Sequence, residues 1–282
     1  MSTLHQQNLA KLRQKLAPHP PHLGVILDGA VASFTDTANS LRFLNTATGL
    51  RELLRELFVA ISPDQSIQAS TWFTADPTSQ TEVTRRHRTL FAVYSYLDPK
   101  HFPTNFASSV DALATQIGKQ VGALCAFTHV TSASLATPEQ AAIACFDSTV
   151  RLFLRLFDAI DSAQEHLRDA LQIELQERLS DIFTSDFFDE LDILSTHTRP
   201  QGAEDVEVEI DDIGAETITF SGTGSVLCDL QYGSDGDCQR GDGLEFSDSY
   251  PFTFSGEART ANPRDVTVDR GDISVDTSSF YE

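Results

Sequence analysis

The sequence has few cysteines and no long apolar run. Four cysteines occur in 282 residues, and none shows C-x-x-C spacing: Cys125, Cys145, Cys228 and Cys238. This spread argues against a structural zinc site. The N-terminus has no apolar signal-like region, and no run of 18 apolar residues follows,. We therefore expect a cytoplasmic protein with reduced thiols and no membrane contact.

The common nucleotide-binding and hydrolase motifs are also missing. The chain contains no P-loop, no G-x-S-x-G elbow, no H-E-x-x-H and no G-x-G-x-x-G after a strand,. Acidic residues from Asp235 to Glu245 could form an oxygen-rich metal loop, but Arg240 and Phe246 occupy two positions where the EF-hand pattern needs Gly and Glu,. A hairpin turn is the favoured interpretation, and we expect no metal and no cofactor.

Basic residues are scarce and unevenly placed. The chain has 20 Lys and Arg against 41 Asp and Glu, a formal net charge of -21. From Pro200 to Glu282 there are 19 acidic residues and four arginines, net -15, which leaves net -6 for the first 199 residues. Solubility is the simplest explanation of the excess. If the protein binds nucleic acid, the N-terminal part has to do so, because the C-terminal part repels phosphates.

The first two thirds of the chain predict helices. The 40% hydrophobic content, with 19 Phe, is enough for substantial cores. Apolar residues recur at spacings of three and four, as in Leu50, Leu53, Leu54 and Leu57,. The predicted helices cover residues 4–16, 30–34, 41–61, 85–97, 110–130, 137–162, 165–183 and 187–194.

The most unusual stretch of this acidic protein is Thr84-Arg85-Arg86-His87-Arg88. Thr84 is a good N-cap for a helix that starts at Arg85. Arginines in a first turn oppose the helix dipole, so an anion or carboxylates are expected beside them.

Arg51 and Arg55, one turn apart, either form a second basic edge or pair with neighbouring acids such as Glu52. Trp72, the only tryptophan, is expected at the edge of a core rather than in base stacking.

A histidine, His129, ends the apolar segment 110–130. Together with the arginines it is compatible with metal-independent RNA cleavage, in which His deprotonates a ribose 2′-OH and Arg stabilises the phosphate charge. Two alternatives remain open. His129 can be an ordinary core histidine, and the arginines can form a salt-bridge cluster or a partner-binding patch.

The pattern changes near residues 198–202, where apolar and polar residues begin to alternate. Short strands are expected at 206–210, 217–220, 225–231, 251–254, 266–268 and 273–275,. The sequence therefore predicts an α+β protein with a helical bundle over residues 1–198, followed by a small antiparallel β-sandwich or barrel over residues 199–282.

Several short segments resemble the predicted pPIWI-associating nuclease family. They span residues 38–282 and keep a common order: Asn39 to Asn45, Leu50 to Leu53, Ala69 to Phe73, Thr84 to Arg88, Phe127 to Val130, Ser195 to His197, Leu230 to Asp235, Arg240 to Gly243, Pro251-Phe252 and Asp276 to Glu282. The resemblance implies a prokaryotic protein of anti-phage or mobile-element conflict systems, with a predicted nuclease activity.

The helical half is also similar to HEPN-type RNase bundles, which usually dimerise and place Arg and His across the dimer cleft. The HEPN signature is an Arg followed a few residues later by a His. Its one formal match here, Arg13 with His19, runs into prolines and is taken as chance. A catalytic assembly would therefore have to bring Arg85, Arg88 and His129 together from different helices.

Two functions follow. The first is a defence-associated nuclease acting on RNA, with Arg85, Arg88 and His129 catalytic and with Arg51 and Arg86 binding phosphate. The second is a non-catalytic component of a defence complex, in which the bundle forms a homodimer and the β domain docks a partner protein.

Overall fold

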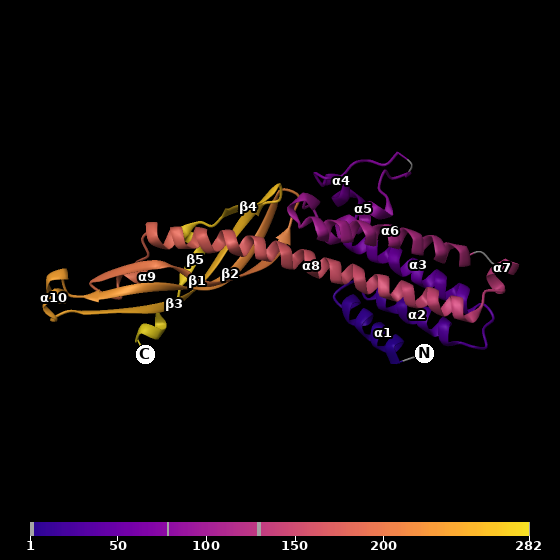
Figure 1. Ribbon diagram of the computed structural model, residues 1–282, viewed down its shortest axis with the longest axis horizontal. Helices are drawn as coiled ribbons and strands as arrows, with labels where there is room; N and C mark the ends of the chain where they lie inside the picture. The colour runs from indigo at the N-terminus through magenta and orange to yellow at the C-terminus, as the bar shows by residue number, and fades with distance from the viewer. Residues whose placement is uncertain (1–2, 78, 129–130, 282) are drawn as a thin grey trace. The chain divides into compact units, whose positions relative to one another are not determined.

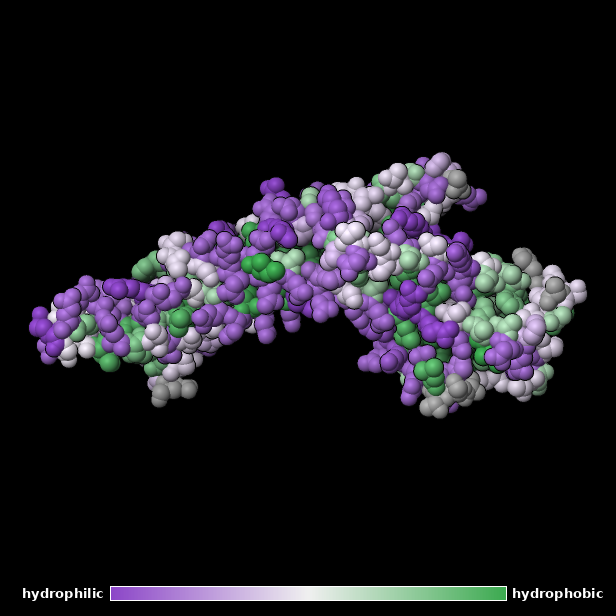
Figure 2. Space-filling view, in the orientation of Figure 1, coloured by the Kyte–Doolittle hydropathy of each residue, from purple (hydrophilic) through white to green (hydrophobic). Residues whose placement is uncertain are grey.

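The computed structural model describes residues 3–77, 79–128 and 131–281, shown as a ribbon in Figure 1. The chain forms two compact units, Met1–Ala163 and Gln164–Glu282. Within the described residues no helix is long and apolar enough to cross a membrane. The face shown in Figure 2 is largely hydrophilic, with hydrophobic residues scattered over it.

The first unit is helical. Its elements are α1 (Thr3–Leu16), α2 (His22–Thr35), α3 (Arg42–Ile61), α4 (Asp64–Ala69), α5 (Arg85–Tyr94), α6 (Thr104–Phe127), α7 (Ser132–Leu135) and the start of α8 (Glu139–Ser185), with a 3-10 turn η1 (Pro99–His101). Helix α3 packs against α2, α5 and α6. Its apolar face is buried as the spacing predicts, with Leu50, Leu53 and Leu57 almost inaccessible,.

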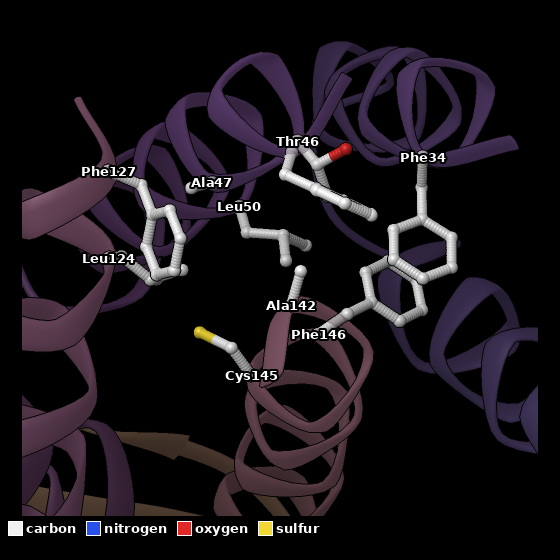
Figure 3. A pocket seen from close by; sticks show the side chains of 10 residues that line it. Phe34, Thr46, Ala47, Leu50, Leu124, Phe127, Ala142, Cys145 and Phe146 are labelled. Atoms are coloured by element: carbon white, nitrogen blue, oxygen red, sulfur yellow. The ribbon is translucent and has the colours of Figure 1, made fainter. Parts of the chain in front are cut away.

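The core of this unit is closely packed where α2, α3, α6 and α8 meet. Phe34 and Phe146 stack with ring centroids 4.3 Å apart. Both rings, together with Leu50, Ala142 and Cys145, line a space of about 20 Å³. Figure 3 shows the side chains around it. A space of this size holds about one water molecule, so it is an imperfection of core packing rather than a ligand site.

The second unit contains a five-stranded antiparallel sheet. Its strands are β1 (His197–Ile213), β2 (Thr217–Tyr232), β3 (Leu244–Arg259), β4 (Asn262–Thr267) and β5 (Ile273–Val275). The order is β1-β2-β3-β4, and β5 also pairs with β3. Short helical turns accompany it: α9 (Asp189–Asp192), α10 (Asp235–Arg240), η2 (Arg270–Asp272) and η3 (Ser278–Tyr281).

The predicted α+β class is confirmed, and the sheet takes the open form of the predicted barrel, a curled half-barrel. Helix gives way to strand at His197, next to the predicted change. The compact units divide earlier, after Ala163. A domain boundary at residue 198 therefore stays a prediction.

Two predicted helices, 137–162 and 165–183, are a single helix, α8. The separation was wrong because no Gly or Pro lies near Ala163 and Gln164, and both are good helix formers,. The last turns of α8 pack on the sheet of the second unit. Phe183 lies 4.8 Å from the ring of Phe252, and Ser180 Oγ accepts the Ala203 N–H at 3.1 Å.

Strand β2 is likewise longer than the two runs predicted for it, because its glycines do not interrupt it. A Cβ on Gly222 would lie 2.3 Å from the Glu207 carbonyl oxygen and 2.4 Å from the Phe254 ring. Glycine therefore lets an aromatic ring of β3 and the backbone of β1 approach β2 closely, which suits a strongly curled sheet.

Gly222→Ala is expected to destabilise the protein by about 1–3 kcal/mol, because backbone and ring must both move. Urea unfolding followed by circular dichroism measures the change. Gly118→Ala is the control, since a Cβ at Gly118 meets nothing within 4 Å and the helix gains about 0.5–1 kcal/mol,. Equal midpoints for the two variants would contradict the close approach at Gly222.

Candidate nucleic-acid interface

A groove of about 720 Å³ lies in the first unit, lined by α3, the segment before α5, the first turn of α5, and α6. Its lining residues are Arg51, Glu52, Leu54, Arg55, Phe58, Val59, Ser79, Val83, Thr84, Arg85, Arg88, Val121 and Cys125. Four arginines and one carboxylate thus face one concave surface above an apolar floor.

Helix α3 supplies two of the arginines, with Glu52 bonded to both. Arg51 Nη2 donates to Glu52 Oε1 at 2.8 Å, and Arg55 Nε donates to Glu52 Oε2 at 2.7 Å. The Arg55 guanidinium, and after it Arg51, hold the pKa of the Glu52 carboxyl below its ordinary value. The predicted Glu52–Arg55 pairing is confirmed. Both arginines also line the groove, so pairing and a basic edge occur together.

The first turn of α5 is built by a reciprocal cap. Thr84 Oγ1 accepts the His87 N–H at 3.3 Å, and His87 Nδ1 accepts the Thr84 N–H at 3.2 Å. The predicted Thr84 cap is confirmed. The role of His87 was not predicted, although a side-chain acceptor three residues after a threonine is the pattern of a capping box.

His87 is therefore a structural histidine, and it does not line the groove. Its ring meets Phe73 edge-on at 5.1 Å. Burial, and next the positive charge of Arg86, lower the pKa of its imidazole from the ordinary 6.5. The neutral ring is also the form that can accept the Thr84 N–H through Nδ1.

The three arginines of this turn differ in their surroundings. Arg85 is exposed, lines the groove and forms no ion pair with any residue that the structure describes. Arg86 points elsewhere: it pairs with Asp111 at 2.5 Å and does not line the groove. The charge of Arg86 is therefore neutralised by a carboxylate, whereas that of Arg85 is not neutralised by any residue that the structure describes.

Arg88 lines the groove and also joins α5 to the end of α3. Its Nη1 donates to the Ser62 carbonyl at 3.2 Å, and Ser62 Oγ donates to the Arg88 carbonyl at 2.8 Å. Its Nη2 lies 2.6 Å from Asp64 Oδ1. The angle of that ion pair is poor, since this oxygen has no hydrogen-bond partner within the described residues. Arg88 thus neutralises the C-terminus of α3 as well as facing the groove.

The structure brings Arg51, Arg85 and Arg88 to one groove and leaves Arg86 out. His129 lies outside the described residues. Cys125, four residues before it in the sequence, lines the groove.

Within residues 3–77, 79–128 and 131–281, no group of three or more His, Cys, Asp or Glu side chains is placed to hold a metal ion. Trp72 packs beside Ile67, Val83 and Phe91, as expected for a core-edge residue.

Two family models match the chain, one over residues 14–153 and the other over residues 160–281, and both are described as predicted pPIWI-associating nucleases. The chain belongs to the predicted pPIWI-associating nuclease family. The resemblance seen in the sequence is thereby confirmed, and the groove lies within the first matched region. The searches of curated proteins and of solved structures each found no match.

The pH dependence of stability is expected to contain a contribution from His87. Since its folded pKa is lowered from 6.5, the unfolded chain takes up the proton first, and stability is lost as pH falls below 6.5 through the folded value,. His87→Gln keeps a capping-box acceptor but cannot titrate. The fall in Tm between about pH 7.5 and about pH 5.5 should be smaller in this variant. An equal fall in both proteins would contradict the assignment.

Proposed function

We propose that the groove binds the phosphates of a nucleic-acid strand, and that this family member is a nuclease acting there. One observation carries the proposal: four arginines, Arg51, Arg55, Arg85 and Arg88, share a groove with a single carboxylate. Guanidinium groups bind phosphate through paired N–H donors, and several of them give an affinity that falls steeply with salt.

The distribution of charge supports a binding surface on the first unit over one on the second. Residues 1–163 hold 13 acidic and 13 basic residues, whereas residues 164–282 hold 28 acidic and seven basic residues. The formal charge of -21 therefore resides entirely in the second unit. A phosphate chain is repelled by that unit and attracted only where basic residues gather locally, as in the groove.

The proposed reaction is metal-independent phosphodiester cleavage in RNA. Arg85 and Arg88 would stabilise the charge that builds on the phosphoryl oxygens, and Arg51 would hold a neighbouring phosphate. His129 would take the proton of the ribose 2′-OH as that oxygen attacks phosphorus. The P–O5′ bond would then break, with the leaving 5′-oxygen taking up a proton from water, to give a 2′,3′-cyclic phosphate and a 5′-hydroxyl. The closeness of His129 to Cys125 in the sequence supports its role. The same proposal includes a HEPN-like helical bundle that forms a homodimer, with the site at the dimer cleft.

The alternative is a non-catalytic component of a defence complex. Two observations favour it: the groove residues that the structure describes include no histidine, and Arg88 already serves α3. In this case the groove binds nucleic acid or a partner's acidic segment without cleaving it. The family description names an association with pPIWI, so a pPIWI protein is the proposed partner in either case.

Arg85→Ala should weaken binding of a labelled single-stranded RNA by roughly tenfold, because one charged hydrogen bond is lost. It should also reduce the slope of log K against log salt by about 0.7, one released counterion. Arg86→Ala is the matched control, with the same charge in the same turn but outside the groove. Equal effects of both substitutions on binding and slope would refute the groove as the binding surface.

Cleavage separates the two functions. The wild-type protein, Arg85→Ala and His129→Ala are incubated with RNA and with DNA in EDTA. The nuclease proposal predicts RNA cleavage that Arg85→Ala and His129→Ala both abolish or reduce by about a hundredfold or more. Binding without cleavage by the wild-type protein would support the non-catalytic alternative.

Glu52→Gln should tighten RNA binding several-fold, because it frees Arg51 and Arg55 from their shared carboxylate,. Asp111→Asn is the control, since it frees Arg86 outside the groove. Fluorescence anisotropy at several salt concentrations measures both. Tighter binding in the control alone would place the nucleic acid elsewhere.

A further inference from the structure

The outer side of β3 is only partly covered. On its inner side β3 pairs with β2 over its whole length, from Leu244 to Arg259, without a register shift. On its outer side β5 pairs with residues 252–254 and β4 with residues 257–259. Residues 244–250 have no outer partner strand within the part of the chain that the structure describes.

Backbone groups along this open edge can be assigned by alternation. The Pro251 carbonyl points outward, because it accepts the Asp276 N–H at 2.8 Å. Every second residue of an antiparallel strand directs its backbone to the same side, so Glu245, Ser247 and Ser249 also point outward. The Ser249 N–H is taken by the Asp248 carboxylate at 2.9 Å. Among residues 3–77, 79–128 and 131–281, no group bonds to the N–H groups of Glu245 and Ser247 or to the three carbonyls, so an added strand could use them.

One face of this edge carries two exposed apolar side chains, and the other face carries two carboxylates. Leu244 and Phe246 are 58% and 41% exposed on the face that they share with buried Tyr250 and with Asp248, whose carboxylate accepts the Tyr250 hydroxyl at 3.2 Å,. Phe246 stacks on Tyr232 at 6.0 Å, which holds the ring in place. On the opposite face stand the carboxylates of Glu245 and Asp229, and Asp229 accepts a hydrogen bond from Ser247 at 2.6 Å.

The other edge of the sheet, β1, is protected against pairing with a further strand. Six exposed acidic residues crowd it between Glu204 and Asp212. The Ala203 backbone is occupied by α8, since Gln176 donates to its carbonyl and Ser180 accepts its N–H. Charged side chains and covered backbone are the usual protection of an edge strand. The open half of β3 combines free backbone groups with exposed apolar side chains instead.

We propose that residues 244–250 of β3 receive an extended segment of a partner protein as an added strand. The segment has apolar residues on one face, against Leu244 and Phe246, and Lys or Arg on the other, facing Glu245 and Asp229. Charge complementarity selects this occupant. A second copy of this chain would add another Glu245 to the face that holds Glu245 and Asp229 and another Asp248 to the face of Leu244 and Phe246, and like charges across a ladder are unfavourable,.

The probe is a fluorescein-labelled nine-residue peptide in which lysine alternates with valine, added to the full-length protein. We expect saturable binding, and Ser247→Pro should weaken it about tenfold or more because an outward N–H is removed. Ser247→Ala keeps that N–H and should change the affinity by less than about twofold. The same peptide with glutamate in place of lysine should not bind.

Hydrogen exchange of the wild-type complex tests the geometry without relying on a variant. The added strand should slow exchange of the Glu245 and Ser247 amides, while the β1 edge is unchanged. The proposal is overturned if the peptide does not bind, if Ser247→Pro binds as Ser247→Ala does, or if these amides gain no protection. Self-association through β3 in sedimentation, without peptide binding, would make a second copy the occupant and overturn the proposal as well.

Discussion

The arginine-lined groove depends on the ion pairs that Glu52 forms with Arg51 and Arg55. Guanidinium groups that face one groove repel one another, and the side of α3 that faces it carries two of them a single turn apart. Glu52 bonds to Arg55 and Arg51. These two arginines lower the pKa of its carboxyl, so it stays ionised. Arg88 is held by different means, through the Ser62 carbonyl at the end of α3 and the nearby Asp64. Of the four groove arginines, only Arg85 has no ion pair within the described structure, and this is the physical basis of the proposed phosphate site,.

The groove arginines matter because the two units differ strongly in net charge. A helical unit with balanced charge can present a basic groove, whereas the β unit carries all the excess acid. The same acid that repels nucleic acid gives the open half of β3 its preference for a basic strand. The family description names both a nuclease and an association with pPIWI. It is consistent with a nucleic-acid site on the first unit and a partner site on the second. Activity and partner choice can then be altered independently, by substitutions in different units.

Local signals in the sequence predicted local structure well. The Thr84 cap, the buried face of α3 and the α+β class all follow from spacing and residue type. Contacts between distant residues did not follow: the tie between Ser62 and Arg88 and the turning of Arg86 toward Asp111 depend on tertiary packing. No role was predicted for His87, although its position three residues after Thr84 is the position that closes the cap. The glycines of β2 looked like breaks because their aromatic cover comes from another strand.

The most direct test of the account is alkylation of Cys125, which lines the groove, in the presence and absence of single-stranded RNA. Cys238, on α10 of the acidic unit, is the internal reference, and mass spectrometry follows both thiols in the same sample. If the groove binds RNA, RNA should slow modification of Cys125, salt should reverse the effect, and Cys238 should react at an unchanged rate. An unchanged rate at Cys125 while RNA is bound, or protection of Cys238 instead, would contradict the account.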